Sequence, residues 1–545
     1  MFIILCVMLF TLIYFYSTRN HNYWAKRNIK HDPALPLFGN HLERAFGMKS
    51  ITQVAFEMYC KYPDEKVRNI KHDPALPLFG NHLERAFGMK SITQVAFEMY
   101  CKYPDEKVVG YYSGNTPELI IRDPDIIKDI LNVDFSYFYT RGFGKDARKQ
   151  VLTQNLFHAD GDSWKLVRQR LTPAFTSAKL KSMFPLIIKC AEQLHGLGDE
   201  IIKTGGDCNV RDLMAKFTIE FIGACGLGVE MDTIKKEDSF FRKLGKNMFH
   251  RSWRDVFYLS ISDIFPETAG FIRVFDKRLE EVLIDTVTKI FQQRNFKPTG
   301  RNDFVDLLLE LSAKGKIMGE SIEEVNQDGS PKIVEVEMDL KCMIAQVFVF
   351  FGAGFETSST STSFTLYKLA QNPDIQLKVQ KEIDEVLAKY DNKLCYDAVS
   401  EMTLLEMSFK EALRMFPPSG ALQRVCRKRY TIRQLDITID PNVRIVIPLQ
   451  AIQNDSRYYD NPDIFLPERW AAEEMKQKQK YVYMPFARLG YMQSLAGLAA
   501  LLQRFSVEPS DKTPTELKIN PHHNVIQGVV DGIPLKLKMR RINIG

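Results

Sequence analysis

Residues 353–359 read AGFETSS, and they interrupt an apolar stretch, 338–371, whose hydrophobic side chains recur at helical spacing. Thr and Ser hydroxyls can bond the carbonyl four residues back and locally open a helix. Such an opening makes room for a ligand or a water, and a buried Glu356–Thr357 pair could pass protons to a bound species. The alternative is a capping or solvent-facing cluster.

Helical patterns dominate the chain after residue 109, and strand-like runs are short. Helices are expected at 163–200, 211–228, 270–294, 303–313, 338–371, 373–389 and 400–416. Strands are expected at 108–113, 118–122, 430–438, 443–448 and 524–540, and the polar stretch 314–337 is expected to be a surface loop. The pattern predicts a mainly α fold with small β-sheets. The chain carries no Gly-rich phosphate loop, no Gly-x-Ser-x-Gly and no HExxH.

Three further segments carry chemistry. In KEALRMFPP (410–418), Glu411 and Arg414 lie on one helix face, where a surface pair is the simpler interpretation and a buried pair would lock the helix to a neighbour. In WKLVR (164–168), an indole N–H and a guanidinium share a face and suit an anionic group. In NDSRYYDNPDIFLPERW (454–470), an extended segment brings Arg469 within possible reach of the Glu411–Arg414 pair.

Residues 1–18 carry no charge. A length of 18 residues is at the short end for a membrane-spanning helix. Basic residues follow at Arg19, Lys26, Arg27 and Lys30, and no small-x-small cleavage site is present. A signal anchor is therefore favoured over a cleaved signal peptide, with everything after residue 19 in the cytosol.

A verbatim repeat follows the anchor. Residues 68–108 repeat residues 27–67 letter for letter, an offset of 41 positions. A single identical pair does not indicate a solenoid, which needs about three or more units. It indicates a recent exon duplication or an error in the gene model. We expect 19–108 to form a hinge and the start of a single catalytic domain that continues through 109–545.

Charge and cysteine content exclude other classes. Lys+Arg is 73 and Asp+Glu is 67, so the net charge of +6 is mild for this length and is not typical of nucleic-acid binding. The 9 cysteines are scattered and form no metal-binding spacing. Their odd number favours a reducing compartment over a disulfide framework.

Taken together and in this order, AGFETS (353–358), EALR (411–414) and PERW (467–470) closely resemble a microsomal cytochrome P-450, a haem-thiolate monooxygenase. The resemblance covers nearly the whole chain, and LTPAFTSAKLKSMF (171–184) looks most like insect members. It implies the cytochrome P-450 fold behind an anchor helix. Roles follow by position. Glu356 and Thr357 would supply protons for the activation of dioxygen. Trp164, Arg168 and Arg424 would bind the propionates of haem b, and Glu411, Arg414 and Arg469 would form a structural triad.

The chain departs from this family at its iron ligand. The family motif Phe-Gly-x-Gly-x-Arg-x-Cys-x-Gly-x-Arg should follow PERW, and its thiolate binds the iron. Here YMPFARLG (483–490) lacks the roughly nine residues that belong between Phe486 and Ala487, so the axial cysteine is missing. No cysteine follows Cys426, which belongs to a segment on another side of the haem. Two interpretations remain: an exon lost in the gene model, or a real product without thiolate ligation.

The resemblance implies oxidation of apolar small molecules such as xenobiotics, plant toxins, insecticides or endogenous lipids, at the endoplasmic reticulum membrane with the catalytic domain facing the cytosol. NADPH-cytochrome P-450 reductase, and cytochrome b5 as a second candidate, would supply electrons at a basic face; no nucleic-acid partner is expected. The alternative is a non-catalytic, membrane-anchored degenerate relative that binds apolar ligands or partners. Phe135, Phe143, Phe351 and Val525 are candidate pocket residues, each equally compatible with ordinary core.

Overall fold

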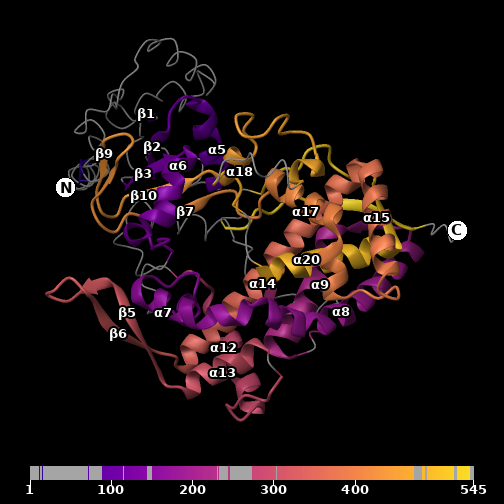
Figure 1. Ribbon diagram of the computed structural model, residues 1–545, viewed down its shortest axis with the longest axis horizontal. Coiled ribbons are helices and arrows are strands. Elements are labelled where there is room, and N and C mark those ends of the chain that lie inside the picture. Colours follow the sequence, from indigo (N-terminus) through magenta and orange to yellow (C-terminus); the bar gives the residue numbers. More distant parts are fainter. Residues whose placement is uncertain are drawn as a thin grey trace, which may run out of the picture.

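The computed structural model describes most of the chain after residue 88 and a few earlier residues (Figure 1). The described residues are 11, 12, 15, 71–72, 89–113, 116–143, 150–229, 231, 244–245, 273–301, 303–471, 481–484, 488–520 and 525–540. Leu12 and Phe15 are helical and exposed. The rest of the expected anchor, the hinge after it and the first repeat copy lie outside the described residues.

Helices make up most of the fold, as the sequence predicts. They are α5 (Ile92–Lys102), α6 (Pro124–Lys128), α7 (Gly161–Leu171), α8 (Ser177–Lys203), α9 (Val210–Ile222), α12 (Lys277–Gln293), α13 (Phe304–Ala313), α14 (Leu340–Gln371), α15 (Pro373–Ala388), α16 (Tyr396–Glu401), α17 (Thr403–Met415), α18 (Leu449–Gln453) and α20 (Arg488–Arg504). The helical half and the strand-rich half lie side by side in Figure 1.

The strands form small sheets. They are β1 (Lys71–His72), β2 (Val108–Ser113), β3 (Thr116–Ile121), β4 (Asp207–Asn209), β5 (Lys316–Val325), β6 (Pro331–Glu337), β7 (Leu422–Val425), β8 (Tyr430–Ile432), β9 (Ile437–Ile439), β10 (Arg444–Ile447), β11 (Phe505–Pro509) and β12 (Pro534–Met539). A five-stranded sheet has the order β1-β2-β3-β10-β7, in which β1–β2 and β3–β10 are parallel pairs. The order β11-β12-β4 forms a second, antiparallel sheet, and β8–β9 and β5–β6 are two-stranded.

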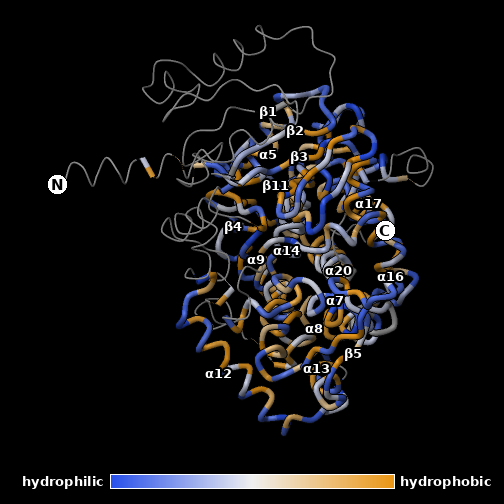
Figure 2. The backbone as a smooth tube through the Cα atoms, turned by 90° about the vertical axis from the view of Figure 1, so that its left-hand side faces the viewer, coloured by the Kyte–Doolittle hydropathy of each residue, from blue (hydrophilic) through white to orange (hydrophobic). Residues whose placement is uncertain are grey.

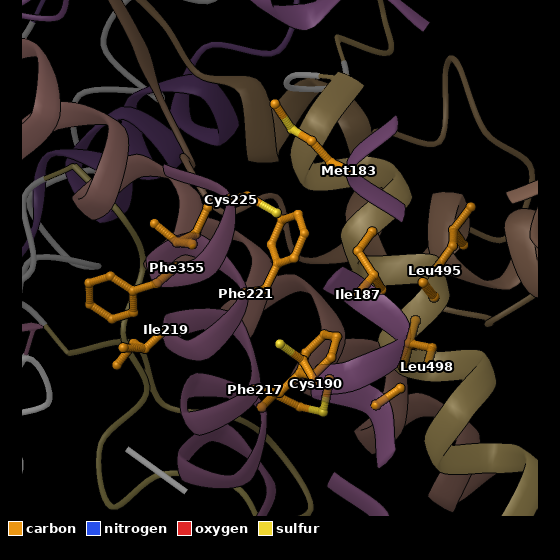
Figure 3. Packing of buried hydrophobic residues seen from close by; sticks show 14 of the residues in the cluster. Met183, Ile187, Cys190, Phe217, Ile219, Phe221, Cys225, Phe355, Leu495 and Leu498 are labelled. Atoms are coloured by element: carbon orange, nitrogen blue, oxygen red, sulfur yellow. The ribbon is translucent and has the colours of Figure 1, made fainter. Parts of the chain in front are cut away.

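Helix α14 is the centre of the large hydrophobic core. Its main helical neighbour is α9, and α8 and α20 close the same cluster. Figure 3 shows Phe217 and Phe221 of α9 between Phe355 of α14 and the side chains of α8 and α20. Complete burial of each such aromatic side chain stabilises the fold by about 1.5–3 kcal/mol. By length and composition α14 would suffice to cross a membrane, yet most of it is buried inside the protein.

Surface helices show the expected amphipathic pattern. Along α12 the buried residues Leu283, Val287, Ile290 and Phe291 recur every three or four positions. Figure 2 shows this helix as alternating hydrophobic and hydrophilic stretches at the edge of the molecule.

Several expectations about local structure were wrong. Residues 430–438 form the antiparallel pair β8–β9 rather than one strand, 400–416 is divided between α16 and α17, and only 534–539 of 524–540 is a strand. Residues 163–200 form two helices, α7 and α8, because Pro173 ends the first helical run. Residues 353–359 do not open α14, which runs unbroken as an α-helix from Leu340 to Gln371. The polar stretch 314–337 is the β5–β6 hairpin rather than a loop, and it lies against α7 (Figure 1).

The hairpin is attached to α7 by polar contacts. Ser321 Oγ donates to Asp162 Oδ2 at 2.7 Å, and the backbone N–H of Ile322 donates to Asp162 Oδ1 at 2.6 Å. Gly161 has a φ of +60°, and a Cβ at this position would overlap the carboxylate of Glu323. Glycine is therefore required where the hairpin meets the first turn of α7.

Candidate functional site

Glu411 and Arg414 of α17 are completely buried, although a surface pair was the simpler expectation from the sequence. Arg414 Nε lies 3.0 Å from Glu411 Oε2, and Arg414 Nη2 lies 2.9 Å from Glu411 Oε1. Arg469, in the 3-10 turn Pro467–Trp470, donates from Nε to Glu411 Oε1 at 3.1 Å. The structure thus brings the three predicted triad residues together.

Glu411 accepts two further hydrogen bonds that the sequence did not indicate. Trp470 Nε1 donates to Oε2 at 2.9 Å, and the backbone N–H of Leu466 donates to Oε1 at 3.2 Å. Arg414 also donates to the carbonyl oxygens of Gln453 at 2.8 Å and Pro462 at 2.6 Å. A buried carboxylate with this many donors is fully compensated, so the network fixes the segment 453–470 against α17.

One stripe of α14 is more accessible than the rest of the helix. Ala353 is exposed and Thr357, one turn later, is partly exposed, while Phe351, Phe355 and Glu356 beside them are buried. Thr357 Oγ1 donates to the Ala353 carbonyl oxygen at 2.6 Å, the bond to the carbonyl four residues back that the sequence suggested. The side of α14 at Ala353 and Thr357 is therefore less completely covered than the rest of the helix.

Glu356 faces a different neighbour. Its carboxylate forms an ion pair with Arg211 at the beginning of α9, 145 positions away in sequence. Burial raises the pKa of Glu356, and the positive charge of Arg211 opposes that shift. Glu356 and Thr357 are therefore adjacent in sequence but have separate hydrogen-bond partners.

The predicted anion-binding residues come from two elements and surround Arg141: Trp164 and Arg424 are half-buried, and Arg168 is exposed. Trp164 and Arg168 come from α7 and Arg424 comes from β7, while the segment 135–143 contributes Arg141. The Arg141 guanidinium lies 6.0 Å from the Trp164 ring, and the Arg141 carbonyl accepts from Gln423 Nε2 at 3.0 Å. Sequence reasoning missed Arg141; its isolated charge within an aromatic run was the available signal.

Two buried donors in this group have no acceptor among the described residues: Trp164 Nε1 and Arg424 Nε. Burial, reinforced by the charge of Arg141, lowers the pKa of Arg424 to about 10. Burial and then the nearby charge of Arg168 lower the pKa of Arg141. A buried donor without an acceptor costs about 1–3 kcal/mol, so a dianionic ligand placed here would relieve both the missing bonds and the repulsion.

An acid borders the group at Asp160. Burial raises its pKa to about 6, against the lowering effects of the Arg141 backbone N–H and the charges of Arg427 and Arg141. Even when ionised, this single carboxylate cannot offset the three charges of Arg141, Arg168 and Arg424. The site keeps an excess of positive charge that favours an anionic ligand.

The predicted pocket residues have mixed positions. Phe135 is half-buried and its ring lies 5.6 Å from the Trp164 ring. Phe143 is half-buried and stacks on Phe157 at 5.1 Å. Phe351 is buried in the core, and Val525 is half-buried. Their role in lining a pocket stays a prediction.

The position of the expected iron ligand lies outside the described residues, since Phe486 and Ala487 are not among them. Cys426 is buried in the smaller core cluster beside the five-stranded sheet, and its Sγ lies 2.9 Å from the Lys428 carbonyl oxygen. Burial raises the pKa of Cys426 to about 12, so the group is a thiol rather than a thiolate at neutral pH. In the described part of the chain, no three His, Cys, Asp or Glu residues gather as a metal site.

Comparison with known proteins identifies one family. The family model described as Cytochrome P450 matches residues 71–531. Cytochrome P450 6B2 of Helicoverpa armigera is 34% identical over 547 residues, covering 99% of this chain and 98% of that protein. Cytochrome P450 6a2 of Drosophila melanogaster is 32% identical over 560 residues, covering 98% and 99%. Cytochrome P450 6k1 of Blattella germanica is 33% identical over 547 residues, covering 97% and 96%.

Proposed function

The chain belongs to the cytochrome P450 family, and on that premise we propose that it is a membrane-anchored monooxygenase of the endoplasmic reticulum that oxidises apolar small molecules. Family membership makes it an oxidoreductase of the monooxygenase class and implies haem as its cofactor. The observation that carries the proposal is the pair of buried, partnerless donors, Trp164 Nε1 and Arg424 Nε, in the part of the chain that the structure describes.

These residues fit one end of the haem. A haem carries two propionates, and the group formed by Trp164, Arg168, Arg424 and Arg141 offers an indole N–H and three guanidinium groups, which match carboxylate geometry well. Bound haem supplies the activation of dioxygen in this family. The accessible stripe at Ala353 and Thr357 would then face the haem and the substrate.

We assign supporting roles to the remaining predicted residues. Thr357 would hold a water or a proton beside the ligand through its hydroxyl, and Glu356 would be the buried acid behind it. Burial raises the pKa of Glu356, and the Arg211 ion pair must open before that acid can turn toward Thr357. Glu411, Arg414 and Arg469 would act structurally, because all three are hydrogen-bonded to one another or to backbone groups.

The residues of this chain do not supply the thiolate ligand that the haem iron requires. The sequence has no cysteine after Cys426, and Cys426 is a buried thiol. We therefore derive no reaction step through the iron for this chain as it stands. We propose that the chain with these 545 residues cannot form the thiolate-ligated haem, and that about nine restored residues between Phe486 and Ala487 would allow it.

The remaining parts of the proposal concern location and partners. Members of this family work with redox partners, and we propose NADPH-cytochrome P-450 reductase, with cytochrome b5 as an additional donor. Residues 1–18 would anchor the protein with its catalytic domain in the cytosol. The substrate class would be apolar xenobiotics, plant toxins, insecticides or endogenous lipids.

The test compares two proteins: the chain as it stands and a chain with the family's cysteine segment inserted between Phe486 and Ala487. Both are purified with haem present, reduced and exposed to carbon monoxide. The chain with the inserted cysteine segment should show an absorption band at about 450 nm. The unaltered chain should not show it, because this band needs a thiolate ligand. A band near about 450 nm from the unaltered chain would contradict the missing ligand. If the chain with the inserted segment takes up no haem, the proposed haem-binding role of Trp164, Arg168 and Arg424 is contradicted.

The missing cysteine also favours a second candidate, a non-catalytic degenerate relative that binds apolar ligands or partners. The two candidates differ in the transcript. Sequencing cDNA across codons 20–110 and 480–495 separates them, because the degenerate relative requires a transcript that carries both the duplication and the gap.

A further inference from the structure

The second copy of the repeat supplies an essential part of the fold. Helix α5 begins with a capping box, in which Gln94 N donates to Ser91 Oγ at 3.3 Å and Ser91 N donates to Gln94 Oε1 at 2.8 Å. Val95 and Met99 are buried in one cluster with Tyr111 of β2 and residues of β3 and β10. The strand that α5 leads into, β2, begins at the last residue of this copy.

Polar contacts lock the same helix to the rest of the protein. Tyr100 Oη donates to Asp455 Oδ2 at 2.5 Å and accepts from Arg457 Nη2 at 2.9 Å. The Arg122 guanidinium lies 4.1 Å from the centre of the Tyr100 ring. Arg122 and Arg457 both donate to the Pro104 carbonyl oxygen, at 2.7 and 3.1 Å.

The residues that receive the repeat segment occur once in the chain, whereas the segment occurs twice. We call the receiving residues the cradle: Tyr111, Ile120, Arg122, Val446, Asp455 and Arg457. Each repeat residue that contacts the cradle has an identical twin 41 positions earlier, such as Met58 for Met99 and Tyr59 for Tyr100. The two copies therefore carry the same docking surface for a single cradle.

We propose that the cradle accepts either copy and that the first copy, residues 27–67, is a spare occupant that replaces the second when the second is damaged. The state with the first copy docked and the state with the second copy docked have the same contacts, because the docked residues are identical. The two states differ in how the chain connects the docked copy to the rest of the protein. With the second copy docked, the extra residues precede the docked segment; with the first copy docked, they become a loop between α5 and β2.

The size of that loop sets the preference. The connection between α5 and β2 has 5 residues, 103–107, with the second copy docked, and 5 + 41 = 46 residues with the first copy docked. Because the cost of closing a loop of n residues grows as (3/2)RT ln n, this lengthening disfavours the first copy by a factor of about 30. The second copy is then the normal occupant, and the first becomes dominant only when the second binds more than about 30 times more weakly.

Hydrogen exchange with mass spectrometry tests the exchange of copies. Peptides from the two copies have the same sequence, so every protein carries Lys61→Arg to distinguish them. In this marked parent, amides of 92–102 should be protected and those of 51–61 should not. Met99→Pro breaks α5 in its interior and removes a buried side chain. Protection should then move from 92–102 to 51–61.

The matched variant Met58→Pro places the same change in the first copy and should leave protection of 92–102 and the melting temperature unchanged. Met58→Pro/Met99→Pro should lose protection in both copies and melt well below Met99→Pro alone. A chain lacking 68–108, which is the same polypeptide as one lacking 27–67, should fold and should lose α5 on Met58→Pro. The proposal is overturned if 51–61 stays unprotected in Met99→Pro, if that variant fails to fold, or if it melts with the double variant. The readouts involve neither haem nor turnover, so they are independent of the proposed activity.

Discussion

The surroundings of Glu411 and those of Trp164 both place arginine side chains around buried polar atoms, yet they differ in how their hydrogen-bonding capacity is used. Glu411 accepts from two arginines, an indole and a backbone N–H, so both oxygens of its carboxylate are used. Near Trp164, the indole N–H and the Nε of Arg424 find no acceptor among the described residues. A complete, fully buried network serves the fold, and an incomplete one, in which Trp164 and Arg424 are half-buried, is prepared for a ligand.

Removing the charge of Glu411 should have the largest effect. Glu411→Gln keeps the shape of the side chain but leaves two buried guanidinium groups without a counter-ion, which should cost about 3–5 kcal/mol in the free energy of unfolding. Thermal unfolding of the haem-free protein measures the loss. Glu385→Gln is the control, since Glu385 forms an exposed pair with Lys381 and should change stability by less than about 0.5 kcal/mol. An equal loss of unfolding free energy in Glu411→Gln and Glu385→Gln would contradict the stabilising role of the Glu411 network.

Arg424→Met should affect the ligand rather than the fold. The haem-free protein should be as stable as the parent or slightly more stable, because a buried, partly unpaired charge is replaced by an apolar chain. In the chain with the restored cysteine segment, haem should dissociate about 10–100 times more readily, which is the value of a charge-assisted hydrogen bond. A haem transfer assay measures this ratio. A large loss of stability without haem would show that Arg424 serves the fold.

Asp160→Asn tests the electrostatics of the incomplete site. The folded-state pKa of Asp160 is raised from 3.8 to about 6, so its ionisation costs stability as the pH rises through that interval. The asparagine variant should be more stable than the parent at pH 7, by about 1–2 kcal/mol, and the difference should vanish near pH 4. Unfolding of haem-free protein in urea across this pH range checks the sign. A parent that is the more stable protein at pH 7 would contradict the burial of this acid.

The contrast between the two regions also separates what the sequence could predict from what it could not. Helical periodicity was enough to place Glu411 and Arg414 on one face. The predicted contact of Arg469 with this pair is present in the structure. Their complete burial depends on the segment 453–470 folding over α17, which no local pattern reports. The Arg211–Glu356 pair joins residues 145 positions apart, and nothing near either residue indicates the other.

The β5–β6 hairpin shows a different kind of failure. Its strands are largely exposed on both faces, so the usual alternation of buried and exposed residues is weak and the stretch resembled a loop. The dipeptide Asp328-Gly329, where Gly329 has a φ of +83°, was the overlooked turn signal. Valine and isoleucine at 333, 334 and 336 were the corresponding strand signal.

The β5–β6 hairpin is also a suitable site for inserting a label. Opposite charges face each other across its strands, in the pairs Lys316–Glu335 and Lys332–Glu324, which discourages edge-to-edge association between molecules. Its turn, residues 326–330, is exposed and is held mainly by its own hydrogen bonds. A fluorophore or an affinity epitope inserted at this turn should report on the folded protein without disturbing the core.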